Sequence, residues 1–390
     1  MKVKSWSTSL AVAVVASVVS PTADAGARPG LPLVDVVAEA ARARAAAEPG
    51  LAAATWTDTK VDVRRSADDR WSFGAVVLVA PRQEDARPRD WLFVAEKRDG
   101  RWHVGLDGHP AFAELAASSP VVTGEEKAVF AAHGGAPATA IDGDYRTGMQ
   151  LPWAVGQSWT MLGGPHAHDA GSGPWSSLDL AGGDQRVLAA RAGLAYTTCV
   201  GLVRVLHPDG YASRYYHLWD HVQADGLSVA AGTFLGHTGT ETGCGGVARA
   251  RHVHFSLMHN GSFIGIANHI VGKWVLRNGA AQYGGSALHG STLVNVGGAL
   301  HNYGALGRTQ GLVDANGGTV VNRRSGPGSG YPVVGTSADG ATVDIRCSAN
   351  GTAHTGRWGT TSLWNRLPDG TWISDAFTYT GVDGPVGAPC

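Results

Sequence analysis

Several features that mark particular classes of protein are missing from this sequence. The net charge is −1 over 390 residues, so no excess of positive charge is available to hold nucleic acid or an anionic membrane surface. No cysteine occurs before Cys199. Beyond the first 20 residues, no apolar run approaches the roughly 20 residues that a membrane-spanning helix needs. We therefore expect neither a nucleic-acid partner nor a membrane-embedded segment in the mature protein.

The N-terminus has the pattern of a secretory signal peptide. Lys2 and Lys4 precede an apolar stretch at 10–19, which is too short to span a bilayer stably. Small residues ending at Ala25 suit a signal peptidase. An uncleaved anchor helix is the alternative, and the short apolar stretch speaks against it. The pattern predicts a signal peptide at 1–25 and a secreted, extracellular protein.

All four cysteines lie in the second half of the chain. An even number of cysteines in an exported protein indicates two disulfides, and three pairings are compatible with the sequence. Their grouping favours Cys199–Cys244 and Cys347–Cys390, with one disulfide in each of two domains. Free buried thiols are the alternative, and they are less common outside the cytosol.

The first part of the chain combines one helical pattern with several strands. An alanine-rich stretch at 32–47, followed by a Pro-Gly pair, predicts a helix. Strand-like runs follow at 71–81 and 90–106, and an Arg-Asp-Gly turn within the second indicates a hairpin. This cysteine-free region, up to about residue 145, is expected to form a separate α+β unit.

From residue 147 the pattern changes to short strands separated by glycines, of which the chain has 55. Hairpins are predicted at 200–218, with a His-Pro-Asp-Gly turn, and at 252–266, with a His-Asn-Gly turn. No long amphipathic helix is predicted between 150 and 280. The fold class is therefore expected to be mainly β, with an antiparallel core.

Histidines are frequent, 16 in all, so spacing must decide which of them are functional. In HVHF, His252 and His254 would point to the same side of a strand, because side chains alternate between its faces. Such a pair can serve one metal together, or one histidine can bind metal while the other moves a proton. H-x-H pairs also occur in amidohydrolases, cupins and carbonic anhydrases, but the α/β alternation of an amidohydrolase barrel is absent here.

A second group of histidines, HAHDAG at 166–171, partly resembles the H-x-H-x-D motif of metallo-β-lactamase-fold hydrolases. Its aspartate, Asp169, comes one residue too early, and no histidine follows it. We exclude that interpretation and expect Asp169 to be a solvated loop charge. We expect His168 to be an exposed loop residue, with an alternate or inhibitory metal ligand as the second interpretation.

Four segments carry a resemblance to a known family. They are MQLPWAVGQSW (149–159), GGPHAHDAGSGPWSSLD (163–179), ASRYYHL (212–218) and ARHVHFSLMHNG (250–261). They resemble the lysostaphin-like zinc endopeptidases of peptidoglycan, in the branch that contains staphylolytic protease and β-lytic metalloendopeptidase. The resemblance covers 147–283 and implies an antiparallel β-sheet zinc peptidase domain with one zinc ion. Cys199 and Cys244 fall where this branch has its disulfide.

The resemblance implies that His166, Asp179 and His254 are zinc ligands and that His217 and His252 are catalytic. His166 and Asp179 are thirteen residues apart, as in that branch. Two neutral imidazoles and one carboxylate leave a fourth position for water, whose pKa falls to about 7 on zinc. We assign the role of base to His252 and stabilisation of the oxyanion to His217, with shared or exchanged roles as the alternative.

The remainder of the chain is expected to contain a linker and a small β-barrel. Residues 284–318 are polar and glycine-rich without periodicity, which is typical of a linker. Short strands and turns at 319–390 fit a barrel. Residues 320–347 and 372–381 resemble the opening and the close of bacterial SH3-like cell-wall-binding domains. The resemblance implies docking on peptidoglycan, and a stabilising domain without a ligand is the alternative.

Together with the signal peptide, the resemblance implies a secreted, monomeric zinc endopeptidase that cuts peptide bonds, glycyl bonds first, in peptidoglycan cross-links. Residues 26–146 would be the propeptide of a zymogen, covering the active site. Because this region lacks cysteine, a thiolate–zinc latch is excluded. Two alternatives stay open: a non-catalytic wall-binding or amidase-activating protein on the same scaffold, and a broader extracellular protease acting on glycine-rich proteins such as elastin.

Overall fold

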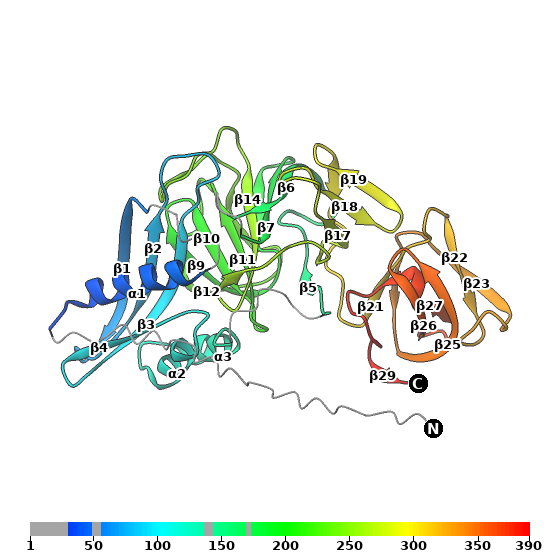
Figure 1. Cartoon of the computed structure of the whole chain (residues 1–390), viewed down its shortest axis with the longest axis horizontal. Coiled ribbons are helices and arrows are strands. Elements are labelled where there is room, and N and C mark those ends of the chain that lie inside the picture. The colour runs from blue at the N-terminus through cyan, green and yellow to red at the C-terminus, as the bar shows by residue number, and fades with distance from the viewer. Residues whose placement is uncertain (1–29, 49–55, 136–142, 169–172) are drawn as a thin grey trace, which may run out of the picture.

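A computed structural model describes residues 30–48, 56–135, 143–168 and 173–390. The predicted signal peptide, 1–25, lies outside the described residues. Within the described part of the chain, no helix is long and apolar enough to cross a membrane. Figure 1 shows three units along the long axis of the molecule: an N-terminal unit of helices and strands, a central β unit and a C-terminal β unit.

The N-terminal unit, 30–135, is an antiparallel sheet with helices packed against it. The predicted helix is confirmed as α1, and the predicted hairpin is confirmed as β3 and β4, joined at Asp99 and Gly100 with φ of 49° and 74°. The sheet order is β1-β2-β3-β4. The elements are α1 (Leu33–Ala47), β1 (Asp58–Ala67), β2 (Trp71–Val79), β3 (Arg89–Arg98), β4 (Arg101–Leu106), α2 (Pro110–Ser118) and α3 (Gly124–Ala132).

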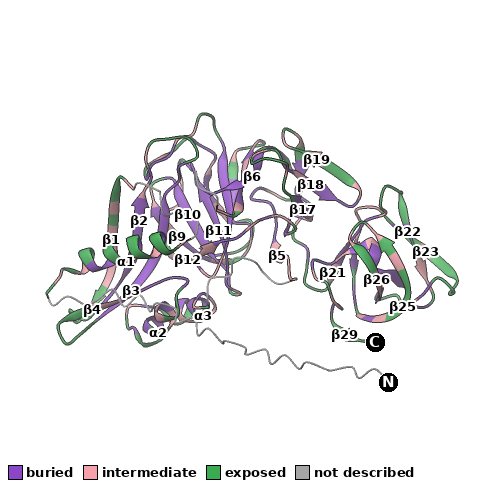
Figure 2. Cartoon of the chain, viewed as in Figure 1, coloured by how far each residue is buried: buried purple, intermediate pink, exposed green. Residues whose placement is uncertain are grey.

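Both faces of this sheet are covered, which explains why β2 and β3 are buried along most of their length. On one face, Val37 and Ala41 of α1 pack against Val76 of β2 and Phe93 of β3. Figure 2 shows β2 and β3 in the buried colour along most of their length. The opposite face forms a core that is shared with the central unit. Its members include Phe73, Leu92, Val94 and Phe112 of the N-terminal unit together with Leu194, Tyr196 and Leu206 of the central unit.

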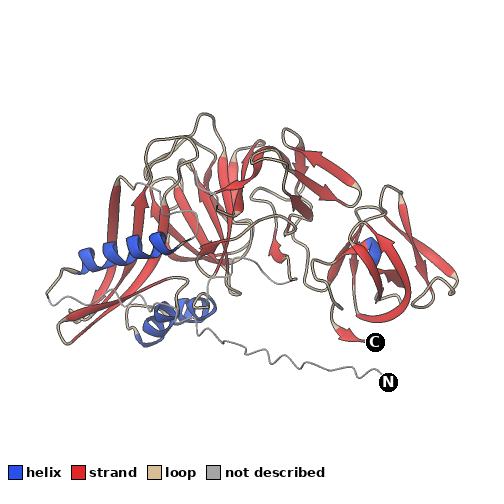
Figure 3. Cartoon of the chain, in the orientation of Figure 1, coloured by secondary structure: helices blue, strands red, loops and turns tan. Residues whose placement is uncertain are grey.

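The central unit is built on a nine-stranded sheet in which β12-β9-β10-β11-β14-β7-β6-β20 are neighbours and β15 pairs with β14. Its strands pair antiparallel, as predicted. Figure 3 shows the α-helices gathered in the N-terminal unit. The strands are β6 (Ser158–Ala167), β7 (Trp175–Ala181), β9 (Gly193–Cys199), β10 (Leu202–Leu206), β11 (Tyr211–Tyr216), β12 (Asp225–Val229), β14 (Val253–His259), β15 (Ser262–Phe263) and β20 (Ala299–His301).

Side-chain alternation divides this sheet into two functional faces. On β14, Val253, Phe255 and Leu257 belong to the central hydrophobic core, so His254 and Ser256 point to the opposite face. That opposite face is the one covered by the N-terminal unit. The predicted disulfide Cys199–Cys244 is present and ties the end of β9 to the segment before β14.

The segment 284–318, expected to be a linker, contains four short strands. The segment forms β18 (Ser286–His289), β19 (Thr292–Asn295), β20 and the start of the C-terminal unit, β21 (Gln310–Val313). β20 pairs with β6 in the central sheet, while β18 and β19 extend a smaller sheet ordered β19-β18-β17-β16-β5. Strands of three or four residues are too short to show a recognisable alternation of apolar and polar residues in the sequence. The neighbouring strands with which they pair stabilise them.

The other short strands complete the central unit. A two-stranded sheet pairs β13 with β8. The remaining bounds are β5 (Arg146–Met149), β8 (Arg186–Leu188), β13 (Phe234–His237), β16 (Ile270–Val271) and β17 (Trp274–Arg277).

The C-terminal unit consists of short strands in two sheets, ordered β24-β21-β28 and β23-β22-β27-β26-β25-β29. The predicted disulfide Cys347–Cys390 is present and joins β25 to the last residue. The likeness to SH3-like domains stays a prediction. The strands are β22 (Val320–Arg324), β23 (Val333–Ala338), β24 (Thr342–Asp344), β25 (Cys347–Gly356), β26 (Gly359–Arg366), β27 (Trp372–Ser374), β28 (Thr378–Tyr379) and β29 (Ala388–Pro389).

Candidate metal centre

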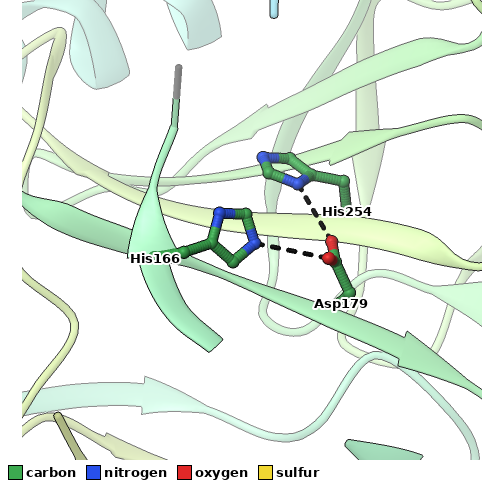
Figure 4. Close-up of side chains that lie close together, drawn as sticks. All are labelled: His166, Asp179 and His254. Carbon is green, nitrogen blue, oxygen red and sulfur yellow. Dashed lines mark hydrogen bonds and ion pairs between the residues drawn. The ribbon is translucent and has the colours of Figure 1, made fainter. Parts of the chain in front are cut away.

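Three adjacent strands bring the predicted metal ligands together. His254 on β14 lies directly opposite Asp179 on β7 in the sheet register. His166 lies near the end of β6, where the pairing with β7 is irregular on both sides of it. Such irregularities re-aim side chains. One ligand atom from each of His166, Asp179 and His254 lies within 4.8 Å of the others, and Figure 4 shows the two imidazoles converging on the carboxylate.

The carboxylate of Asp179 contacts both imidazoles. Its Oδ1 lies 3.1 Å from Nδ1 of His254, and its Oδ2 lies 3.5 Å from Nε2 of His166. Burial alone would raise the pKa of Asp179, but the neighbouring His166 and His254 imidazoles outweigh it and hold the pKa well below 3.8. Asp179 is therefore a carboxylate at neutral pH, which is the form that binds a cation.

The hydrogen bonds around the two histidines leave one suitable nitrogen on each. Nδ1 of His166 lies 2.8 Å from the carbonyl oxygen of Ala167 and donates to it, so Nε2 keeps its lone pair. That Nε2 is buried and has no hydrogen-bond partner among the described residues. Burial lowers the pKa of His254 well below 6.5, so this imidazole is neutral. Two neutral imidazoles and a carboxylate fit the donor set of a zinc site with an open position.

The two predicted catalytic histidines lie beside this site. His252 directly precedes β14, and its Nε2 is 3.5 Å from Oδ1 of Asp179. His217 follows β11 with φ of 71°, so the alternation of the strand does not set its direction. The ring centroids of His217 and His252 are 4.8 Å apart.

Backbone carbonyls set the tautomers of these two histidines. Nδ1 of His252 lies 2.8 Å from the oxygen of Ala250, and Nδ1 of His217 lies 2.8 Å from the oxygen of Glu241. Both Nε2 atoms are buried and lack a hydrogen-bond partner among the described residues. Burial lowers the pKa of His217 to about 3. The neutral ring therefore presents a proton acceptor, not a donor, at Nε2.

The expectation that His168 is an exposed loop residue is wrong. The side chain is 2% exposed, its ring stacks on Phe263 at a centroid distance of 3.8 Å, and its Nε2 lies 3.0 Å from the carbonyl oxygen of Pro88. The N-terminal unit thus covers it, which the local sequence does not reveal. Nδ1 of His168 lies 3.4 Å from Nε2 of His254. Asp169 lies outside the described residues.

These contacts form one consistent chain of tautomers. Nε2 of His168 donates to Pro88, so its Nδ1 is an acceptor for Nε2–H of His254. With the proton on Nε2, His254 keeps the lone pair on Nδ1, the nitrogen that faces Asp179. His168 is thus a neighbour that orients a metal ligand and fixes its tautomer.

Tyr283 is a site residue that sequence reasoning missed. Its ring stacks on His166 at a centroid distance of 4.1 Å, and its hydroxyl donates to the carboxylate of Asp85. It lies more than a hundred residues beyond His166. A single tyrosine among glycines gives no spacing signal, so only the folded chain reveals the contact.

Comparisons with known proteins match the central unit. Residues 173–265 match peptidase family M23. β-Lytic metalloendopeptidase of Lysobacter enzymogenes is 33% identical over 129 residues, which cover 30% of this chain and 71% of that protein. Protease LasA of Pseudomonas aeruginosa is 34% identical over 147 residues, which cover 35% of each chain. The match thus spans about a third of the length of LasA.

The solved structure of the M23 metalloprotease pseudoalterin is 27% identical, with a TM-score of 0.37, over 39% of this chain and 97% of that one. The match to β-lytic metalloendopeptidase covers more than two thirds of that enzyme. His166, Asp179 and His254 are gathered in one place. The chain belongs to the M23 family of zinc metalloendopeptidases, and these three residues form its His–Asp–His metal site.

Proposed function

We propose that the chain is a secreted zinc endopeptidase that hydrolyses peptide bonds, glycyl bonds in particular, in bacterial peptidoglycan cross-links. The observation that carries the proposal is the gathering of His166, Asp179 and His254 beside two further histidines with unpartnered Nε2 atoms. The names of the relatives, β-lytic metalloendopeptidase and protease LasA, support peptidase activity. Two disulfides support an extracellular location.

His166, Asp179 and His254 would hold the zinc ion, which would supply a Lewis acid that lowers the pKa of water to about 7 and polarises the scissile carbonyl. His252 would accept a proton from the attacking water at Nε2 and would give it to the leaving amine. We assign stabilisation of the oxyanion to His217, which must first take up a proton at Nε2, because the ring is neutral in the unprocessed chain. Since its Nδ1–H is used by Glu241, His217 donates at Nε2 only as an imidazolium. Tyr283 holds the ring of His166 in place by stacking.

The contacts around the metal centre support the proposal that 26–146 is a propeptide. Asp85 binds the hydroxyl of Tyr283, and the main chain at Pro88 binds His168. Burial lowers the pKa of His254, and the charge of Arg87 lowers it further. Arg87, itself only 5% exposed, therefore lies near the site. A segment in this place blocks the approach of a substrate.

The proposed domain boundaries follow from the sheets. We propose that the catalytic domain, predicted at 147–283, extends to about residue 302. The pairing of β20 with β6 and the hydrogen bonds from Nδ2 of Asn302 to the carbonyl oxygens of Leu151 and Trp153 support this boundary. The C-terminal unit is proposed to dock on peptidoglycan. Such a module would keep the enzyme on an insoluble substrate by raising its effective concentration.

The test uses the full chain, processed after folding and loaded with zinc. Gram-positive walls with pentaglycine bridges should release muropeptides that carry new glycine N-termini by mass spectrometry. Elastin at equal mass should be cleaved far more slowly. Equal cleavage of elastin would favour a broader protease. One zinc per chain without any new N-terminus would support the non-catalytic alternative.

We predict that His168→Ala weakens zinc binding about tenfold, because Nε2–H of His254 loses its acceptor. Competition with a chromophoric chelator measures the dissociation constant. In His168→Asn an amide oxygen can take the place of Nδ1 and should restore part of the affinity. His301→Ala, which removes an imidazole bonded to Ser158 far from the metal ligands, is the matched control. If the wild type and the three variants bind zinc with equal affinity, His168 does not orient the metal ligand.

A further inference from the structure

The sheet face that carries the metal ligands continues across the neighbouring strands. Tyr216 of β11 lies opposite His254, and Arg214 lies opposite Ser256. Arg204 of β10 lies opposite Arg214. Because residues two apart share a face, Arg214 is a diagonal neighbour of His254, at a typical Cα separation of about 7–8 Å. The two arginines therefore lie on the same face as the metal site.

This arrangement is unfavourable unless an anion is present. Like charges directly opposite each other on paired strands destabilise a sheet, and Arg204 and Arg214 are both 0% exposed. Their carboxylate partners are Asp90 and Asp107, and both come from the N-terminal unit. Nη2 of Arg204 lies 3.1 Å from Oδ2 of Asp107. Loss of the N-terminal unit would leave two neighbouring cations on the open sheet.

The carboxylate of Asp90 is held by three side chains of the central sheet. Nε of Arg214 donates to Oδ1 at 2.8 Å, and the hydroxyl of Thr198 donates to Oδ2 at 3.0 Å. Nη1 of Arg204 lies 3.8 Å from Oδ2. Burial alone would raise the pKa of Asp90, but Arg214 and Arg204 outweigh it and hold the pKa below 3.8. We call Thr198, Arg204 and Arg214 the arginine subsite.

The chain that delivers Asp90 also passes the metal centre. The carbonyl oxygen of Pro88 accepts hydrogen bonds from Nε2 of His168 and Nη2 of Arg214, each at 3.0 Å. One residue earlier, Arg87 lies close enough to His217 and His254 for its charge to act on both. An extended segment of three residues spans about 10 Å. Residues 87–90 thus run from the metal centre to the arginine subsite.

Resting on the proposed function, we infer that Asp90 occupies a substrate subsite of the mature enzyme. Once the N-terminal unit has left, Thr198, Arg204 and Arg214 bind a carboxylate of the substrate about three residues from the bond that is cut. The ligand class is an anionic peptide, with the carboxylate on an acidic side chain or at a free C-terminus. Arg214 is then a specificity-determining residue, and residues 87–90 imitate the bound substrate.

The test compares matched glycine peptides cut by the processed full chain. In the first set of peptides, Glu or Gln is placed two, three or four residues from the scissile bond. In the second set, the peptide ends at one of these positions, either in a free carboxylate or in an amide. At one of these positions we expect kcat/KM to be about tenfold higher for the carboxylate, as a charge-assisted hydrogen bond implies. The pair that shows the preference identifies the source of the carboxylate.

Variants assign the preference to the arginine subsite. In Arg214→Gln the ratio of kcat/KM for the carboxylate peptide to kcat/KM for the amide peptide should fall to about one. In Arg214→Lys the ratio should lie between one and the wild-type value. Arg277→Gln, an exposed arginine on β17, should keep the wild-type ratio. A ratio taken within one protein is insensitive to any loss of folded enzyme.

A second measurement needs no variant. A synthetic peptide of residues 85–92, DARPRDWL, should inhibit the processed enzyme about tenfold better than the same peptide with Asp90→Asn. The inference fails, while the proposed function stands, if the wild type cuts the carboxylate and amide peptides of each pair equally and the two inhibitory peptides act equally. If the zinc-loaded wild type cuts neither peptide nor cell walls, the proposed function itself fails.

Discussion

Replacing His254 with alanine is expected to lower kcat/KM of the processed enzyme at least about a thousandfold. The change removes one of the three metal ligands, and zinc contributes several kcal/mol to transition-state stabilisation, each 1.4 kcal/mol being about tenfold in rate. The imidazole is 0% exposed, and its side-chain hydrogen bonds go to Asp179 and His168. Release of muropeptides from cell walls measures the rate.

The matched control is His259→Ala. His259 lies five residues further along β14, on the face opposite to His254, and is outside the metal group. It should keep zinc and wall-lytic activity, and circular dichroism should confirm that both variants are folded. Wall lysis by His254→Ala at the rate of the wild type would contradict the assignment of this residue as a metal ligand.

The second large effect is expected from Asp90→Ala in the unprocessed chain. It removes the partner of Arg214, whose side chain is fully buried. Leaving a buried charge without its partner typically destabilises a protein by about 3–5 kcal/mol. The N-terminal unit should therefore unfold or detach at much lower urea, which limited proteolysis of residues 30–135 can follow across a urea series.

Two comparisons isolate the buried pair. Asp62→Ala removes a 63% exposed carboxylate that pairs with Arg64, so it should destabilise the unit by about 1 kcal/mol or less. Replacing both buried partners, Asp90→Leu with Arg214→Met, should recover part of the stability lost by Asp90→Ala. An unchanged urea midpoint for Asp90→Ala would show that the pair does not hold the N-terminal unit in place.

The metal ligands could be predicted because they lie in two segments that resemble the lysostaphin-like zinc endopeptidases. His166 and Asp179 are thirteen residues apart, and His254 belongs to an H-x-H pair at a hairpin, where alternation sets its direction. The two disulfides also followed from the grouping of the cysteines. The disulfides were thus predicted from the residues alone, whereas the ligand set depended on the resemblance.

Other parts of the site depend on contacts between distant segments. Asp90 and Arg214 are 124 residues apart, and neither has a spacing that identifies its partner. His168 is buried between Phe263, on which its ring stacks, and the main chain at Pro88 of the N-terminal unit. The strands within 284–318 contain three or four residues each, so the sequence carries no usable period and a linker was expected.

Anomalous diffraction at the zinc edge from crystals of the zinc-loaded chain tests the central claim most directly. One strong peak should lie about 2.0–2.2 Å from Nε2 of His166, a carboxylate oxygen of Asp179 and Nδ1 of His254. His217 and His252 should stay outside this bonding distance. A peak bound to His168 or His252 in place of one of the three ligands, or no peak at this site, would contradict it.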